Sequence, residues 1–162
     1  MTGPAPDADL ARELQAVVAA VSAGDIDRAG RLCDAALAAG RIHPLFFKLR
    51  AVSHERGGRL GEAIDDFRSA LAVAPDDFAA LSALGSCLAR SGRLPEALVA
   101  LDASIALNGS YAPAHCNRGW TLETAGDRSG ARAATDPPLW AEMAANPPRA
   151  CSVLGSMASA CS

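Results

Sequence analysis

The sequence has few aromatic residues, only one lysine and no long apolar run. Aromatic residues make up 4% of the 162 residues although 50% are hydrophobic, so alanine and leucine carry most of the apolar content. This composition favours helices that pack closely through small side chains. No run of 18 or more apolar residues occurs, and we expect no membrane span. The polar start of the chain also lacks the basic and apolar regions of a secretory signal.

Charge of either sign is also sparse. Charged residues make up 20% of the chain and the formal net charge is −3. This balance is too mild to favour a nucleic-acid or acidic-membrane partner, and the basic residues form no stripe interleaved with aromatics. Lys48 stands alone against fourteen arginines, which we interpret as the codon bias of a GC-rich, bacterial genome.

The cysteines are odd in number and scattered along the chain, at Cys33, Cys87, Cys116, Cys151 and Cys161. A disulfide framework would require even numbers at compact spacings. We therefore expect reduced thiols in a cytoplasmic protein.

An internal repeat of 34 residues is the informative feature of the sequence. Four glycines follow this step, and an alanine comes five residues after each of them: Gly24, Gly58, Gly92 and Gly126, then Ala29, Ala63, Ala97 and Ala131. Coincidence at two linked positions in four places is improbable by chance, and a period in this range is typical of stacked helical repeats.

Each of these glycines lies between two helical patterns. Before Gly92, Leu81, Leu84 and Leu88 fall three and four residues apart, as one face of a helix requires, and a similar apolar pattern follows it. Glycine ends the first helix because it alone adopts a left-handed backbone cheaply. The alanine allows two helices to approach closely where they cross.

The pattern predicts four helix–turn–helix repeats, at 10–43, 44–77, 78–111 and 112–145. Within them we expect helices at 10–22, 25–38, 44–56, 59–72, 78–90, 93–106, 112–124 and 127–135. We expect residues 1–9 to be disordered, residues 10–135 to form the repeat domain, and residues 136–162 to form an irregular proline-rich tail with a C-terminal helix in one interpretation.

These repeats resemble the tetratricopeptide repeat family. The second repeat matches best, through Phe47, Ala51, Gly58, Ala63, Phe67, Ala70 and Pro75. The third keeps Leu81, Leu84, Gly85, Leu88, Gly92, Ala97 and Leu101, the fourth keeps Gly119, Leu122, Gly126 and Ala131, and the first keeps Gly24, Ala29 and Ala36. The resemblance implies an all-α fold, a right-handed α-solenoid of about four hairpins.

By the same resemblance, the first helices line a concave groove that holds a peptide from a partner protein. The expected groove residues are Gln15, Lys48, Leu49, Val52, Arg56, Ser82, Ser86, Arg90, Asn117 and Trp120. Lys48, Arg56 and Arg90 are candidates to hold an acidic peptide or a terminal carboxylate. Trp120 is a candidate aromatic anchor. The alternative is that the arginines are solvated helix-end residues and that Trp120 packs against the tail.

The chain departs from two binding patterns known in the family. Val52 and Ala83 stand where the carboxylate clamp of some members has asparagines. Of the asparagine ladder found in other members, only Asn117 is present. These departures argue against a clamp for chaperone tails and leave the partner unidentified.

No catalytic or metal-binding constellation occurs in the sequence. No HxxxH, HExxH or CxxC spacing, phosphate loop or GxSxG elbow is present. We expect His54, His115 and Cys33 to pack in the core, one carboxylate of Asp65-Asp66 to face water, and Asp76-Asp77 to serve as a turn and helix cap. We therefore expect no enzymatic activity, no cofactor and no metal.

The repeat pattern fails after Thr135. Pro137-Pro138 arrives where the eighth helix should continue, and Pro147-Pro148 follows. In one interpretation, 139–146 and 150–161 are short helices that cover the open end of the stack. In the other, the tail comes from a truncated or frame-disrupted gene.

Two functional hypotheses follow from this sequence. The first is a scaffold that binds a protein or peptide in its groove, and the second is the N-terminal repeat region of a larger bacterial sulfotransferase or glycosyltransferase. Self-association through the apolar C-terminal end is a further possibility, since an uncapped repeat stack exposes apolar surface.

Overall fold

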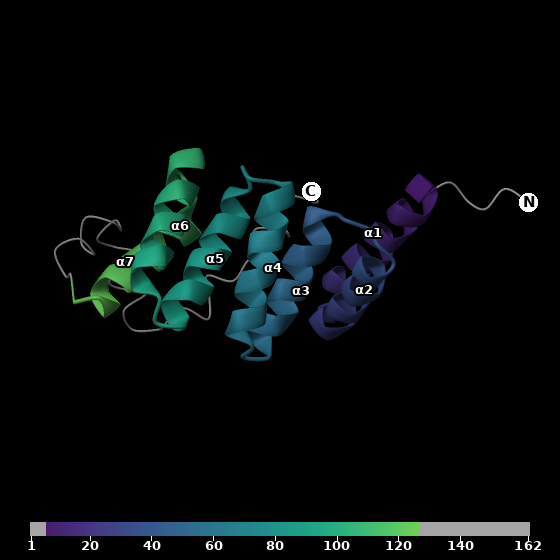
Figure 1. Cartoon of the computed structure of the whole chain (residues 1–162), viewed down its shortest axis with the longest axis horizontal. Helices are drawn as coiled ribbons and strands as arrows, with labels where there is room; N and C mark the ends of the chain where they lie inside the picture. The colour runs from purple at the N-terminus through teal and green to yellow at the C-terminus, as the bar shows by residue number, and fades with distance from the viewer. Residues whose placement is uncertain (1–5, 127–162) are drawn as a thin grey trace, which may run out of the picture. The chain divides into compact units, whose positions relative to one another are not determined.

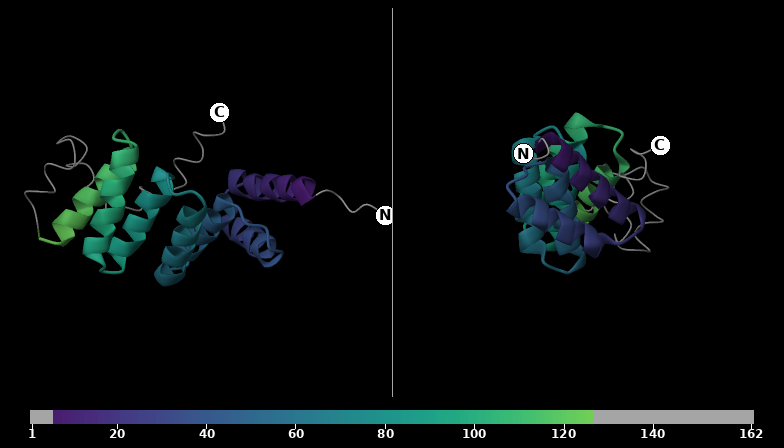
Figure 2. Two further views of the ribbon diagram at one scale, coloured as in Figure 1. Left: turned by 45° about the horizontal axis from the view of Figure 1, so that its top comes forward. Right: turned by 90° about the vertical axis from the view of Figure 1, so that its right-hand side faces the viewer.

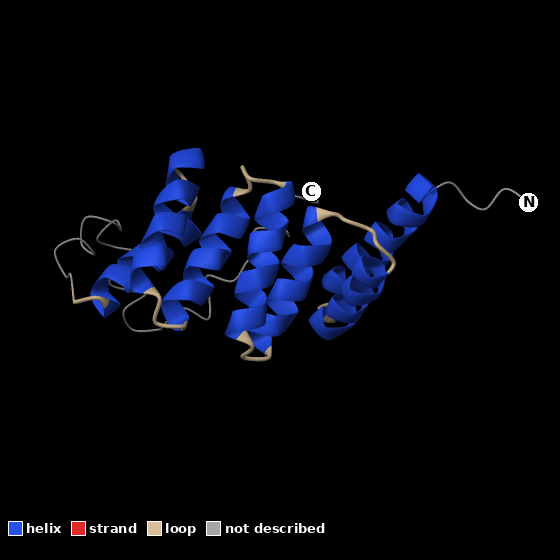
Figure 3. Cartoon of the chain, in the orientation of Figure 1, coloured by secondary structure: helices blue, strands red, loops and turns tan. Residues whose placement is uncertain are grey.

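The computed structural model describes residues 6–126, and within this range the chain is built of seven α-helices and turns, with no strand (Figure 1, Figure 3). The helices are α1 (Pro6–Ser22), α2 (Ile26–Ala38), α3 (Pro44–Arg56), α4 (Leu60–Val73), α5 (Phe78–Arg90), α6 (Leu94–Leu107) and α7 (Ala112–Thr124). The chain divides into two compact units between Val73 and Ala74. We call the part with α1–α4 the N-terminal unit and the part with α5–α7 the C-terminal unit.

Six of the seven helices begin and end within one residue of the expected positions. The exception is α1, which begins at Pro6 rather than at residue 10. The expectation of disorder up to residue 9 is therefore wrong for residues 6–9. Proline is compatible with the first position of a helix because its missing N–H has no partner there in any case.

The 34-residue glycines make the turns between paired helices. Their φ angles are all positive, at 75° for Gly24, 75° for Gly58, 81° for Gly92 and 84° for Gly126. At Gly58 the turn is closed by the Arg59 N–H, which donates to the His54 carbonyl at 2.9 Å. The left-handed backbone expected at these glycines is confirmed, and it fixes where each hairpin reverses.

Carboxylates cap two of the helices that follow the turns and loops. The Ala80 N–H donates to Oδ1 of Asp77 at 2.9 Å, which starts α5 and confirms the expected capping role of the Asp76-Asp77 pair. The Arg28 N–H donates to Oδ1 of Asp25 at 2.9 Å and starts α2 in the same way. Both contacts satisfy a backbone donor that a helix otherwise leaves without a partner.

The N-terminal unit has its core between α2, α3 and α4. Helices α3 and α4 lie side by side in all the views, and α2 packs on α3 (Figures 1 and 2). Phe46 and Phe67 are fully buried, and Ala63 is buried where the two helices cross. Cys33 is also buried, as expected, and this burial raises the pKa of its thiol to about 12.

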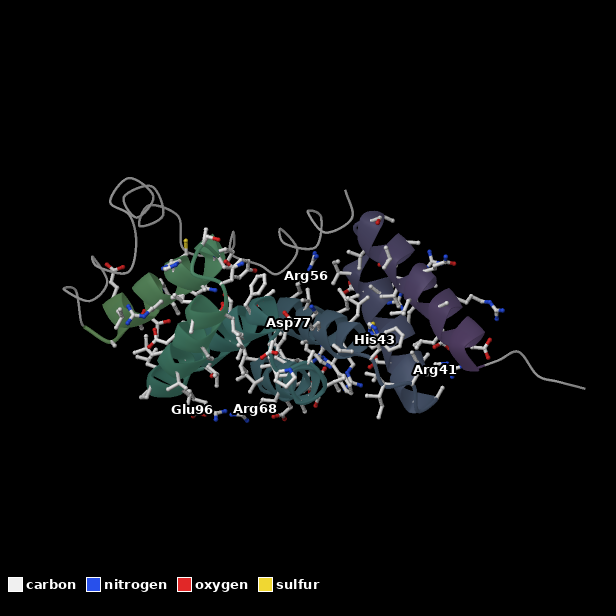
Figure 4. The ribbon with its side chains drawn as sticks, turned by 90° about the horizontal axis from the view of Figure 1, so that it is seen from above. Arg41, His43, Arg56, Arg68, Asp77 and Glu96 are labelled. Carbon is white, nitrogen blue, oxygen red and sulfur yellow. The ribbon has the colours of Figure 1, made fainter. Side chains whose placement is uncertain are left out.

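Helix α1 is attached differently. It packs on α2 and makes no comparable contact with α3, and only Val17 and Ala20 of it are fully buried. Arg41, in the loop after α2, reaches back to α1 (Figure 4), where its Nε lies 2.9 Å from Oε2 of Glu13 and its Nη2 lies 3.6 Å from Oδ2 of Asp9. The Glu13 contact has ion-pair distance without hydrogen-bond geometry.

The C-terminal unit packs α5 against α6, and α7 against both. A Cβ atom on Gly85 would lie 2.6 Å from Cγ of Leu101, so the absent side chain lets α5 and α6 approach closely. Ala97 is fully buried at the same crossing, as expected. Ser104 donates its hydroxyl to the Phe78 carbonyl at 2.7 Å and ties the two helices together again.

Several expectations lie outside the described residues. These are the eighth helix at 127–135, the short helices at 139–146 and 150–161, the irregular tail at 136–162, the disorder of residues 1–5 and the interruption of the reading frame.

Candidate partner-binding site

Helix α3 of the N-terminal unit carries three of the predicted groove residues on one face. Lys48, Val52 and Arg56 are spaced by four residues, which places them one above the other along a helix. Lys48 is partly exposed and Arg56 is exposed, and Figure 4 shows Arg56 pointing away from the ribbon. Val52, however, is only 2% exposed, so its assignment to an open surface is wrong. An apolar side chain on this face gains more from burial than from contact with water.

The C-terminal unit places the remaining predicted residues on two neighbouring helices. Ser86 and Arg90 lie on α5 and Trp120 lies on α7, and these two helices contact each other. Ser86 and Trp120 are partly exposed, and Arg90 is exposed. This unit therefore holds an aromatic ring, a small hydroxyl and a guanidinium on adjacent first helices.

Asn117 does not belong to the exposed surface. Its side chain is 2% exposed, and its Nδ2 lies 3.3 Å from Oγ of Ser82, which is also buried. The expectation that both line a groove is wrong because their polar groups satisfy each other between α7 and α5. Leu49 is likewise buried, whereas Gln15 on α1 is exposed as expected.

A polar cluster in the N-terminal unit was missed by the sequence reasoning. Arg50 on α3 donates from Nε to Oδ2 of Asp66 at 2.8 Å and from Nη2 to Oδ1 at 2.5 Å, in a bidentate pair with α4. Its Nη1 also lies 3.5 Å from Oδ1 of Asp34 on α2, and its guanidinium carbon lies 5.8 Å from the centre of the Phe47 ring. Asp66 is 5% exposed, and its hydrogen bond raises the pKa of Arg50. The pair thus joins three helices.

His54 extends this cluster toward the surface. Its Nδ1 accepts from Nε of Arg59 at 3.0 Å, and its Nε2 lies 3.5 Å from Oδ2 of Asp66. Glu62 completes the group, since its Oε2 lies 3.0 Å from the same Nδ1. The expectation of a hydrogen-bonded histidine holds, but the side chain is 19% exposed rather than enclosed in the apolar core.

A spacing in the sequence could have revealed part of the cluster. Arg50 follows Asp34 by 16 residues, and Arg118 follows Asp102 by the same distance, two repeat lengths later. The second pair is also formed, between Nε of Arg118 and Oδ1 of Asp102. The bond to Asp66 had no such signal, because one aspartate of the Asp65-Asp66 pair had to be chosen. The structure exposes Asp65, which confirms that one of the two faces water.

The chemistry of these groups is structural. The Asp66 carboxylate is already paired with Arg50, so it joins helices and is not set up to exchange protons with a substrate. Within residues 6–126, no three histidine, cysteine or acidic side chains gather in a way that would hold a metal ion. No helix in this range is long and apolar enough to cross a membrane. Cys33, Cys87 and Cys116 are free thiols.

Paired antiparallel helices, reversed every 34 residues at a left-handed glycine, define a helical-repeat protein whose first helices carry the exposed polar side chains. The sequence profile of the tetratricopeptide repeat matches residues 14–72 and 48–115. The chain therefore belongs to the tetratricopeptide repeat family. No curated protein matches the sequence.

Solved structures agree with this fold. The chain is similar to YrrB, a tetratricopeptide repeat protein described as having an unusual peptide-binding site, with 22% identity, a TM-score of 0.70, and coverage of 90% of this chain and 72% of that one. It is similar to MamA with 24% identity, a TM-score of 0.66, and coverage of 73% and 69%. An O-GlcNAc transferase mutant from Thermobaculum terrenum matches with 24% identity, a TM-score of 0.67 and 75% coverage of this chain, which spans 23% of the transferase.

Proposed function

We propose that the protein is a scaffold that binds a peptide segment of a partner protein along the first helices of its repeats. The tetratricopeptide repeat fold suits protein–protein interaction, and one similar structure is described as a peptide-binding protein. The observation that carries the proposal is the recurrence of an exposed arginine in the last turn of two first helices, Arg56 on α3 and Arg90 on α5, one repeat apart.

The proposed contacts follow from the side chains that stay accessible. Lys48, Arg56 and Arg90 attract an acidic segment or a terminal carboxylate through charge-assisted hydrogen bonds. Trp120, partly exposed beside Ser86, provides apolar area for a side chain of the partner. Val52 and Asn117 support this surface from within, because both are buried.

The ordinary role of arginine at a helix end must be separated from partner binding, since a cation there also interacts favourably with the helix dipole. The test is an affinity capture with the wild type and with the triple variant Lys48→Glu, Arg56→Glu, Arg90→Glu. A matched control carries Arg28→Glu, Arg31→Glu and Arg68→Glu, which make the same charge change on the second helices α2 and α4.

We expect the first triple variant to lose the captured partner and the control to keep it, with the wild-type helix content in both by circular dichroism. Loss in both variants would mean that net charge alone governs capture, and retention in both would overturn the proposed surface. Trp120→Ala should weaken capture at unchanged net charge.

A second candidate function is the repeat region of a larger bacterial transferase, in which these repeats recruit a substrate for a catalytic domain. The similarity to part of an O-GlcNAc transferase favours it. An immunoblot of the source cells tests it, because the 162 residues account for 16.5 kDa and a transferase would be far heavier. A single band at 16.5 kDa would eliminate this alternative. A cytoplasmic location and self-association stay part of the proposals, and gel filtration with light scattering tests the latter.

A further inference from the structure

The first turn of α3 is capped by a histidine. Helix α3 starts with Pro44, which has no N–H, so the first backbone donor to need a partner is the N–H of Leu45. That N–H donates to Nδ1 of His43 at 3.2 Å. The backbone of His43 is extended, with φ −145° and ψ 136°, as a capping residue requires, and its ring lies 5.8 Å from the Phe46 ring.

This cap differs chemically from the caps of α2 and α5. Asp25 and Asp77 hold those helices with carboxylates, which accept hydrogen bonds at any pH above their own low pKa values. An imidazole accepts at Nδ1 only while it is neutral, because the imidazolium carries a proton on both nitrogens. The positive charge would also stand at the positive end of the helix dipole.

We propose that His43 is a proton-sensitive cap: the neutral ring holds the first turn of α3, and protonation of the ring releases it. The released turn leads into the helix that carries Lys48 and Arg56. An effect of acid on partner binding therefore rests on the proposed function, whereas the cap itself does not.

The surroundings of the ring favour its neutral form. Lys48, one turn further along α3, is a positive group that disfavours a second one. The chain ends that face the start of α3, residues 35–40 of α2 and its turn and residues 70–73 of α4, contain no ionisable side chain.

Arg41, the other charged residue close to His43 in sequence, is held by Asp9 and Glu13 of α1. The carboxylates of α1 are thus occupied by a guanidinium. The ring therefore faces Lys48 and apolar helix ends.

Partial burial of the ring, followed by the charge of Lys48, lowers the pKa of His43 below its ordinary value of 6.5. The folded protein therefore binds fewer protons at this position than the unfolded chain does. The stabilisation from the cap is present above about pH 6.5 and is lost as the pH falls through the lower folded value.

The test uses His43→Asn, which keeps a capping side chain but does not titrate, and His43→Ala, which removes the cap at every pH. Two-dimensional NMR of the wild type follows the His43 ring and the Leu45 amide from pH 8 to pH 5. We expect both to titrate with one midpoint below pH 6.5. Thermal unfolding of each protein is measured at pH 7.5 and 5.5, and the wild type should lose about 4 °C relative to His43→Asn on acidification.

His115→Asn is the matched control, because the His115 ring meets the Gly109 carbonyl at 2.8 Å through Nε2 and does not cap a helix. This variant should keep the acid response of the wild type. His43→Ala should unfold at a lower temperature than His43→Asn at both pH values. The proposal is overturned if His43→Asn loses as much stability as the wild type, or if the Leu45 amide does not follow the His43 ring.

Discussion

The α3–α4 hairpin and the α5–α6 hairpin reverse at equivalent glycines but differ in their interiors. Arg50 and Asp66 form a bidentate pair in the first, whereas Leu84 and Ala100, 34 residues further on, occupy the corresponding places in the second. Leu84 and Ala100 are both 7% exposed. The same hairpin thus accepts an ion pair or apolar side chains at these positions, because its geometry comes from the glycine turn and from a buried alanine at the crossing.

The largest effect is expected from breaking the ionic pair on one side. Arg50→Ala leaves the buried Asp66 carboxylate without its cation, and we expect a loss of about 3–5 kcal/mol in the free energy of unfolding. Urea unfolding followed by circular dichroism measures it. The double variant Arg50→Leu, Asp66→Ala copies the C-terminal unit and should recover most of the loss. A single variant as stable as the wild type would show that the pair does not hold the N-terminal unit together.

A Cβ atom at the close crossing of α5 and α6 is expected to have the next largest effect. Gly85→Ala brings that atom within 2.6 Å of Leu101 Cγ, and the overpacking should cost about 1–3 kcal/mol. The matched control is Gly61→Ala on α4, where a Cβ meets no atom within 4 Å and the better helix propensity of alanine should leave stability equal or higher. Thermal unfolding compares the two variants. Equal stabilities would contradict the close contact.

The turns that the two hairpins share should respond alike. Gly58→Ala and Gly92→Ala each force a side chain into a left-handed backbone, with φ of 75° and 81°, and each should cost about 1–2 kcal/mol. Chemical denaturation of both variants under one set of conditions provides the measurement. A difference much larger than the error would mean that the turns are not equivalent and that the comparison fails at its common element.

The smallest effect is expected from the exposed counterpart of the ionic pair. Asp102 is 56% exposed in its contact with Arg118, so Arg118→Ala should cost less than about 1 kcal/mol. The difference from the wild type should shrink further in 1 M salt, which screens exposed charges. A loss as large as that of Arg50→Ala would mean that burial does not set the strength of these pairs.

The positions of the helices and turns were predictable because they depend on local chemistry. Gly58 and Gly92 specify the reversals by themselves, and Asp77 specifies the start of α5. The start of α1 at Pro6 was missed because the repeat pattern begins only at residue 10 and a helix can extend beyond it.

The candidate site was less predictable because it depends on which side of a helix is covered. Lys48, Arg56, Ser86, Arg90 and Trp120 stay accessible, but Val52 and Asn117 are buried. Repeat position alone does not distinguish these outcomes, since the polar group of Asn117 found its partner in Ser82, 35 residues away. The choice of Asp66 rather than Asp65 by Arg50 likewise depended on the rotation of α4, which the sequence pattern did not resolve.

The attachment of α1 through Arg41 has a consequence for the order in which the N-terminal unit opens. Ion pairs with partly exposed partners lose strength as ionic strength rises, whereas the apolar contacts among α2, α3 and α4 do not. Concentrated salt should therefore detach α1 while its neighbours stay folded. The amides of α1 then exchange with solvent ahead of those of α3 and α4, and the unit unravels from one end as a zipper does.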